Sequence, residues 1–119
     1  LGVTQMIPRV CGIDKAFDLL ATGRTYGAEE AEKLGVITRC VEDEALIPEA
    51  EKLAGKILKN APYCIAALKD CIYKTMELPL SEGLVYEGKA CAPLFGQPDQ
   101  KEGMTAFLEK RKANLTKTF

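Results

Sequence analysis

The sequence has no histidine among its 119 residues. Histidine is the side chain that most often acts as a general base, so its absence excludes Ser–His and Cys–His dyads from this chain. A zinc site would also lack the imidazole that commonly completes its ligand set. We therefore expect no metal site in this chain.

The five cysteines form no pattern that would replace such a site. Their number is odd, and no two of them have CxxC spacing, so neither a disulfide framework nor a thiolate zinc site is expected. Cys64 and Cys71 are seven residues apart on a predicted helix, and we interpret both as small buried hydrophobic side chains on one face. Free thiols are typical of a reducing compartment. We expect a cytoplasmic protein or, in a eukaryote, one of the mitochondrial matrix.

Two classes of partner are excluded by charge and hydropathy. No apolar run approaches the roughly 20 residues needed to span a bilayer, and residues 1–10 contain Pro8 and Arg9 where a signal peptide would be apolar. The net charge of -1 argues against general nucleic-acid binding, because the basic tail at residues 110–117 is short. The sequence therefore predicts neither a membrane nor a nucleic-acid partner.

Apolar side chains recur at helical spacing along almost the whole chain, whose length suits one domain at most. The spacing predicts helices over residues 12–21, 28–34, 44–59, 62–78, 81–95 and from 99 onward. The helix at 44–59 is the clearest of these and has a wide apolar stripe. Expected end signals are Asp43 and Ser81 as caps, Asn60 in a left-handed closing conformation, and Asp99 with Glu102 as a capping box.

One β-branched run, residues 36–41, predicts a short extended segment between helices. An isolated strand leaves its backbone groups unpaired, so its partner would have to come from another segment or another chain. The predicted fold class is therefore mainly α, with at most one short isolated strand.

Several segments resemble, in order, the crotonase family of enoyl-CoA hydratases and isomerases. The first, residues 1–12, resembles the family's Gly-Gly-Thr-Gln-Arg-Leu loop and helix start, but departs from it at Val3 and Met6, where glycine and arginine are usual. Three further segments are Leu20-Ala21-Thr22-Gly23, residues 28–37, and Ala61-Pro62 followed by Lys69. The pattern continues with the single residues Glu87 and Phe95. It ends in residues 99–111, where the matching residues are Asp99, Glu102-Gly103-Met104, Ala106-Phe107 and Lys110-Arg111.

The resemblance implies that the chain is the C-terminal helical part of a crotonase-like domain, in the α/β spiral fold shared by ClpP and crotonase. Residues 1–41 would end the core region, and residues 42–119 would form a helical region for assembly and for covering coenzyme A (CoA). In that family two backbone N–H groups stabilise a thioester enolate, and two glutamates position and activate water. These groups would precede Leu1, so no catalytic residue is expected in this chain.

The resemblance also assigns a few residues of this chain. A phenylalanine and a lysine of the last helix reach a neighbouring subunit's CoA in the family, and they match Phe107 and Lys110. Gly2 and Thr4 match the loop beside the active site. Two alternatives remain open: Phe107 could be core on a stripe with Met104 and Leu108, and Lys110 could simply complement the helix dipole.

The function implied is hydration of a trans-2-enoyl-CoA by a homo-oligomer, a trimer or hexamer, with an acyl-CoA substrate and no cofactor, since CoA is part of the substrate. The chain alone would be inactive. The alternative is a non-catalytic helical module for assembly or for binding CoA esters. Its apolar stripes must be buried against something, which predicts self-association.

Overall fold

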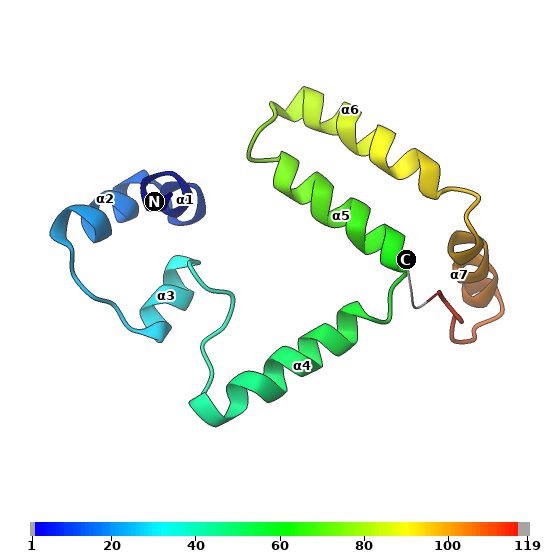
Figure 1. The fold of residues 1–119 in the computed structure, drawn as a ribbon, viewed down its shortest axis with the longest axis horizontal. Coiled ribbons are helices and arrows are strands. Elements are labelled where there is room, and N and C mark those ends of the chain that lie inside the picture. Colours follow the sequence, from blue (N-terminus) through cyan, green and yellow to red (C-terminus); the bar gives the residue numbers. More distant parts are fainter. Residues whose placement is uncertain (1, 117–119) are drawn as a thin grey trace. The chain divides into compact units, whose positions relative to one another are not determined.

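The computed structural model describes residues 2–116; Leu1, and Lys117 of the basic tail, lie outside this range. The described part is helical and contains no β-strand (Figure 1). Its elements are α1 (Val3–Cys11), α2 (Ile13–Thr22), α3 (Ala28–Leu34), the 3-10 helix η1 (Asp43–Ala45), α4 (Leu46–Ile57), α5 (Pro62–Lys74), α6 (Leu80–Cys91), the 3-10 helix η2 (Ala92–Leu94) and α7 (Pro98–Leu108). The chain divides into an N-terminal unit, Leu1–Ile47, and a C-terminal unit, Pro48–Phe119. No helix of the described part is long and apolar enough to cross a membrane.

The N-terminal unit is built on two helices joined by a single residue. Gly12 donates its N–H to the carbonyl of Pro8 at 3.0 Å, and its own carbonyl accepts from Ala16 at 3.1 Å. Its φ of 88° is open to glycine and strained for other residues. Arg24 then joins α2 to α3, because its guanidinium pairs with Asp18 at 3.4 Å and with Glu30 at 2.6 Å.

Helix α1 was not predicted as a separate helix. The resemblance implied only a loop and a helix start over residues 1–12. Pro8, which lacks the N–H that an interior helical residue donates, also disfavours a helix there. The structure starts α1 at Val3, directly after Gly2, and continues it through Pro8 to Cys11. Thr4 therefore lies in the first turn of a helix.

The C-terminal unit contains α4 from Pro48 onward, the hairpin of α5 and α6, η2 and α7. Helices α5 and α6 pack side by side (Figure 1). The Tyr86 hydroxyl donates to Asp70 across this hairpin at 2.6 Å, and Lys74 pairs with Glu77 at 2.6 Å near the turn. Pro93 lies in η2, which replaces the last turn predicted for the helix at 81–95. The helices expected from apolar spacing are therefore present, and most of their ends differ from the expected ones by one to four residues.

Three of the residues predicted to end or begin helices have other roles in the structure. Asp43 opens η1 rather than capping α4, and Ser81 lies inside α6, whose N-cap position is Pro79. Asn60 keeps a negative φ and instead donates its side-chain amide to the carbonyls of Lys56 and Ile57, at 3.3 and 3.1 Å. A side-chain bond thus closes the turn after α4 in place of the expected left-handed residue.

The β-branched run at residues 36–41 forms no strand. The N–H groups of Val36 and Ile37 both donate to the carbonyl of Ala31, at 2.9 and 3.3 Å, so they belong to the turn that closes α3. Gly35 permits this turn with a φ of 79°. With no neighbouring strand among residues 2–116, the rest of the run has no ladder to join.

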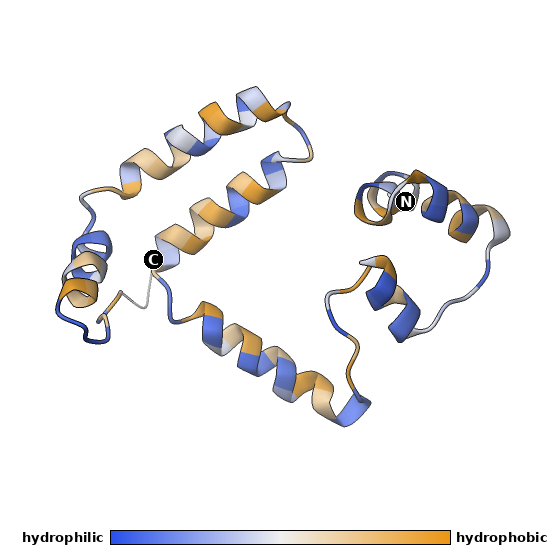
Figure 2. Cartoon of the chain, turned by 180° about the vertical axis from the view of Figure 1, so that it is seen from behind, coloured by the Kyte–Doolittle hydropathy of each residue, from blue (hydrophilic) through white to orange (hydrophobic). Residues whose placement is uncertain are grey.

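Very little apolar surface is buried within the described chain. The buried apolar residues are Ala16, Leu19, Ala31, Ala61 and Ala106. Figure 2 shows apolar residues recurring along α5 and α6, as the sequence predicted. Many of these residues remain exposed in the described chain. On this hairpin Leu68, Ile72, Leu84 and Val85 are each more than half exposed. Such helices need a further apolar surface to cover them.

Candidate functional site

The candidate site lies on α7 and on the chain that follows it. Gln97 is the N-cap residue of α7 and Pro98 opens the helix, a position that tolerates the missing N–H of proline. The predicted capping box does not form, since no side chain caps this helix. Both of its carboxylates, Asp99 and Glu102, instead bind the segment 111–116, which follows the helix.

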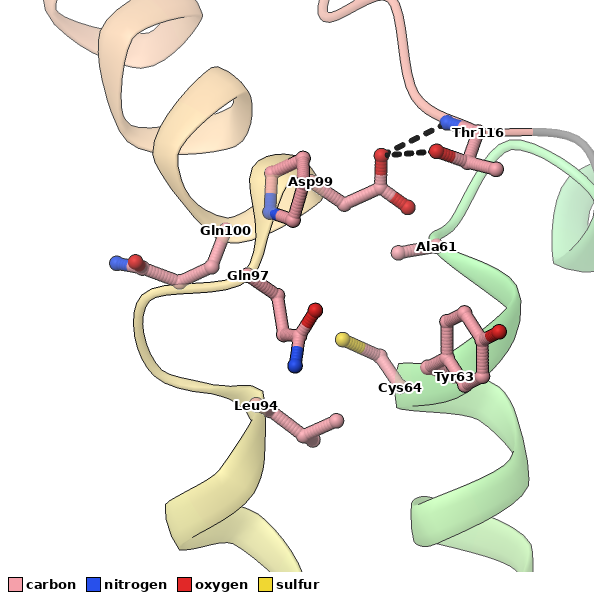
Figure 3. A pocket seen from close by; sticks show the side chains of 9 residues that line it. Ala61, Tyr63, Cys64, Leu94, Gln97, Asp99, Gln100 and Thr116 are labelled. Atoms are coloured by element: carbon pink, nitrogen blue, oxygen red, sulfur yellow. Dashed lines mark hydrogen bonds between the residues drawn. The ribbon is translucent and has the colours of Figure 1, made fainter. Parts of the chain in front are cut away.

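Asp99 holds the end of this segment. One of its carboxylate oxygens accepts hydrogen bonds from the backbone N–H and the hydroxyl of Thr116, each at 2.8 Å (Figure 3). Glu102 holds the middle, because its Oε1 accepts from the N–H of Asn114 at 2.8 Å. The segment therefore returns toward the first turn of α7.

Glu102 also forms a two-bond pair with Arg111. The two guanidinium nitrogens lie 2.6 and 2.9 Å from its two oxygens, and the Nε of Arg111 donates to Glu109. The Arg111 hydrogen bonds, with a smaller effect of the Asn114 N–H, lower the pKa of Glu102 to about 2. The same bonds raise the pKa of Arg111 above its usual value. The pair therefore stays ionised at neutral pH.

The turn that ends α7 has the hydrogen bonds of a Schellman motif. The Lys110 N–H donates to the carbonyl of Phe107 at 3.2 Å, and the Arg111 N–H donates to the carbonyl of Ala106 at 3.0 Å. Lys110 occupies the left-handed position of this motif with a φ of 54°, and no other non-glycine residue in the described range has a positive φ. A residue with a Cβ costs about 1–2 kcal/mol there relative to glycine.

The two predicted CoA-binding residues lie on this one turn. The Phe107 side chain is 81% exposed, and Ala106 is the buried residue of α7. Met104 and Leu108 are exposed as well, so these three side chains form no core within the C-terminal unit. Lys110 is exposed and has no ion-pair partner among residues 2–116. An exposed aromatic ring and an unpaired ammonium group are thus three residues apart.

The two residues predicted for the loop beside the active site lie in the other unit. Gly2 adopts a φ of 92° and its carbonyl accepts from Gln5 and Met6, at 3.0 and 2.9 Å. It therefore occupies the N-cap position of α1, and Thr4 lies within that helix. Neither residue belongs to the unit that carries Phe107 and Lys110.

Sequence reasoning missed the cavities beside the start of α7. One, of about 500 Å³, has a mainly apolar lining that includes Leu94, Phe95, Met104 and Leu115. A smaller one, of about 150 Å³, lies where Gln97, Asp99 and Thr116 face the start of α5 (Figure 3). The returning segment supplies Leu115 and Thr116, and its position depends on bonds to Asp99 and Glu102 that span 12 to 17 residues.

The cysteines behave differently from the prediction. All five are free thiols. Cys64 is exposed and lines both cavities, so its assignment as a buried side chain is wrong. Cys71 is half-buried, and burial raises its thiol pKa. Within residues 2–116 no three cysteine or acidic side chains gather in a way that could hold a metal ion.

Comparison with known proteins places these helices in a family. The model of the enoyl-CoA hydratase/isomerase family matches residues 1–118. A crotonyl-CoA hydratase from Syntrophomonas wolfei is 40% identical over 114 residues, which are 96% of this chain and 44% of that protein. A probable mitochondrial enoyl-CoA hydratase from Dictyostelium discoideum is 42% identical over 110 residues, which are 92% of this chain and 40% of that protein.

Solved structures agree with the sequence relatives. The crystal structure of an enoyl-CoA hydratase from Bacillus anthracis superposes with a TM-score of 0.92 at 32% identity, over 98% of this chain and 45% of that chain. The chain thus spans less than half the length of the relatives it matches. Its helices are a helical part of the crotonase fold, and the chain belongs to the enoyl-CoA hydratase/isomerase family.

Proposed function

We propose that this chain is the C-terminal helical part of an enzyme that hydrates trans-2-enoyl-CoA thioesters. The family match over residues 1–118 carries the proposal, and relatives named crotonyl-CoA hydratase and enoyl-CoA hydratase support it. Residues 1–41 would end the core region, and residues 42–119 would serve assembly and CoA binding. The catalytic glutamates and the oxyanion N–H groups would be supplied by chain outside these 119 residues.

Within this part, Phe107 and Lys110 are proposed to contact CoA. The Lys110 ammonium is exposed and unpaired in the described range, which suits a phosphate group as a point charge. Phe107 offers an exposed ring three residues away that can cover an apolar or aromatic part of the ligand. The CoA would be that of a neighbouring subunit, as the resemblance implies.

The chain alone is expected to be inactive. A crotonyl-CoA hydration assay, which follows loss of the conjugated thioester absorbance, should show turnover with the complete polypeptide and none with the 119 residues. Turnover by the 119-residue chain would contradict the proposal that the catalytic groups lie outside it. No metal or redox cofactor is proposed for the reaction, and CoA enters as part of the substrate.

The exposed apolar faces favour assembly as part of the function. Leu68, Ile72, Leu84 and Val85 of the α5–α6 hairpin have no cover within the described chain. We infer a homo-oligomer, a trimer or a hexamer, in which such faces are buried. Analytical ultracentrifugation should detect it, and a compact monomer at high concentration would count against it.

A second candidate function is a non-catalytic helical module for assembly or for binding CoA esters. The same exposed faces support it, because they do not depend on any catalytic group. CoA binding without hydration by the complete polypeptide would favour this candidate over the enzyme. For the location we propose the cytoplasm or the mitochondrial matrix, and the Dictyostelium relative is named as mitochondrial.

A further inference from the structure

The turn after α7 contains more cations than its nearby carboxylates neutralise. Three consecutive basic residues, Lys110, Arg111 and Lys112, follow Glu109. Arg111 takes both acidic partners, since its guanidinium pairs with Glu102 and with Glu109. Among residues 2–116, Lys110 therefore has no ion-pair partner, although it lies between Glu109 and Arg111. Both neighbouring carboxylates are thus engaged by Arg111 and not by the lysine.

The same bonds hold the backbone of the turn. Arg111 is fixed by its two-bond pair to Glu102 and by its N–H bond to Ala106, and Asn114 is fixed by its N–H bond to Glu102. Lys110 lies at the left-handed position inside this bonded turn, with a φ of 54°. A non-glycine residue keeps such a conformation only when the surrounding structure determines it. Glu102, one of the less exposed side chains here, supplies three of those bonds.

We propose that Glu102, acting through Arg111, is a positioning residue for Lys110, and that together they present the Lys110 ammonium to a phosphate of CoA. The inference rests on the proposed CoA contact of Lys110 and adds the residues that make the contact strong. Neither Glu102 nor Arg111 needs to touch the ligand.

The ionisation of Glu102 fits this role. The Arg111 hydrogen bonds keep its pKa at about 2, so the pair is intact around neutral pH, where a phosphate carries negative charge. The presentation of Lys110 is therefore constant around neutral pH. No histidine in the chain could change it there.

The test uses the complete polypeptide and isothermal titration calorimetry with CoA. Glu102→Gln should weaken CoA binding about threefold to tenfold, the effect of losing the preorganisation of one long side chain. Simple electrostatics predicts the opposite sign, because the substitution removes a negative charge near a cation that binds phosphate. Binding of pantetheine, which lacks every phosphate of CoA, should not change.

A double-mutant cycle separates positioning from a general loss of stability. Lys110→Ala should weaken CoA binding, and adding Glu102→Gln to it should cause no further loss, because the two act through one contact. Arg111→Lys keeps the charge but loses the two-bond geometry, so it should weaken binding as Glu102→Gln does. The matched control is Glu77→Gln, which breaks the exposed pair with Lys74 in the same unit and should leave CoA binding unchanged.

The outcomes distinguish the two levels of the proposal. If the unsubstituted protein binds no CoA, the proposed function fails and the positioning role fails with it. If it binds CoA but Glu102→Gln binds it equally well or more tightly, the positioning role alone is wrong. The positioning role would also be wrong if Glu102→Gln lowered CoA affinity by the same factor in the original protein and in the Lys110→Ala variant, since Glu102 would then act through another contact.

Discussion

Replacing Lys110 with glycine should stabilise the C-terminal unit while weakening CoA binding. Lys110 has a φ of 54° at the position of a Schellman motif that glycine usually occupies. Removing its Cβ relieves about 1–2 kcal/mol of left-handed strain. The greater freedom of glycine in the unfolded chain returns about 0.4–1 kcal/mol of this. The free energy of unfolding should therefore rise by about 1 kcal/mol, the middle of the range these two effects allow, while the ammonium group that we assign to CoA is lost.

The assay is urea denaturation followed by circular dichroism, with CoA affinity measured on the same samples. Lys112→Gly is the matched control, because Lys112 is also an exposed lysine in the turn but has no positive φ. There glycine adds freedom to the unfolded chain without relieving strain, so stability should fall slightly. A Lys110→Gly protein that is less stable than the original would refute the reasoning, because the lysine would then contribute to folding.

Three further predictions follow from the contacts of the C-terminal unit. Asp99→Asn should weaken the bonds to Thr116 and lower stability by about 1 kcal/mol, and the Thr116 amide should exchange hydrogen faster. The pKa of Glu102 is depressed in the folded state, so the stabilisation it provides is complete above about pH 4.5 and is lost as the pH falls toward 2. The free energy of unfolding, measured by urea denaturation at several pH values, should show this loss in the original protein and not in Glu102→Gln. Leu84→Lys, at an exposed position of α6, should reduce the sedimentation coefficient of the oligomer without reducing helix content.

Helix positions were predicted well from apolar spacing because that spacing is local. The helix expected at residues 28–34 is α3 with the same bounds, and those expected at 44–59 and 62–78 contain α4 and α5. Helix α1 was missed because Pro8 in its interior argues against a helix. Local signals thus predicted most of the helical content of the chain.

The ends of helices and the candidate site depend on partners far along the chain, which spacing does not reveal. Asp99 and Glu102 have the spacing of a capping box, yet they bind Thr116, Arg111 and Asn114, 9 to 17 residues away. The left-handed Lys110 was equally hidden, because lysine has no preference for that conformation. Phe107 and Lys110 came from the resemblance alone, and their CoA contact stays a prediction.

Both the proposed reaction and the proposed CoA contact can be tested by the steady-state hydration of crotonyl-CoA, measured for the complete polypeptide and for its Lys110→Ala variant. We predict turnover by the unsubstituted protein. In the variant KM should rise with little change in kcat, because a phosphate contact remote from the double bond binds substrate and transition state alike. No hydration by the complete polypeptide, or a variant with the KM of the original, would contradict the account.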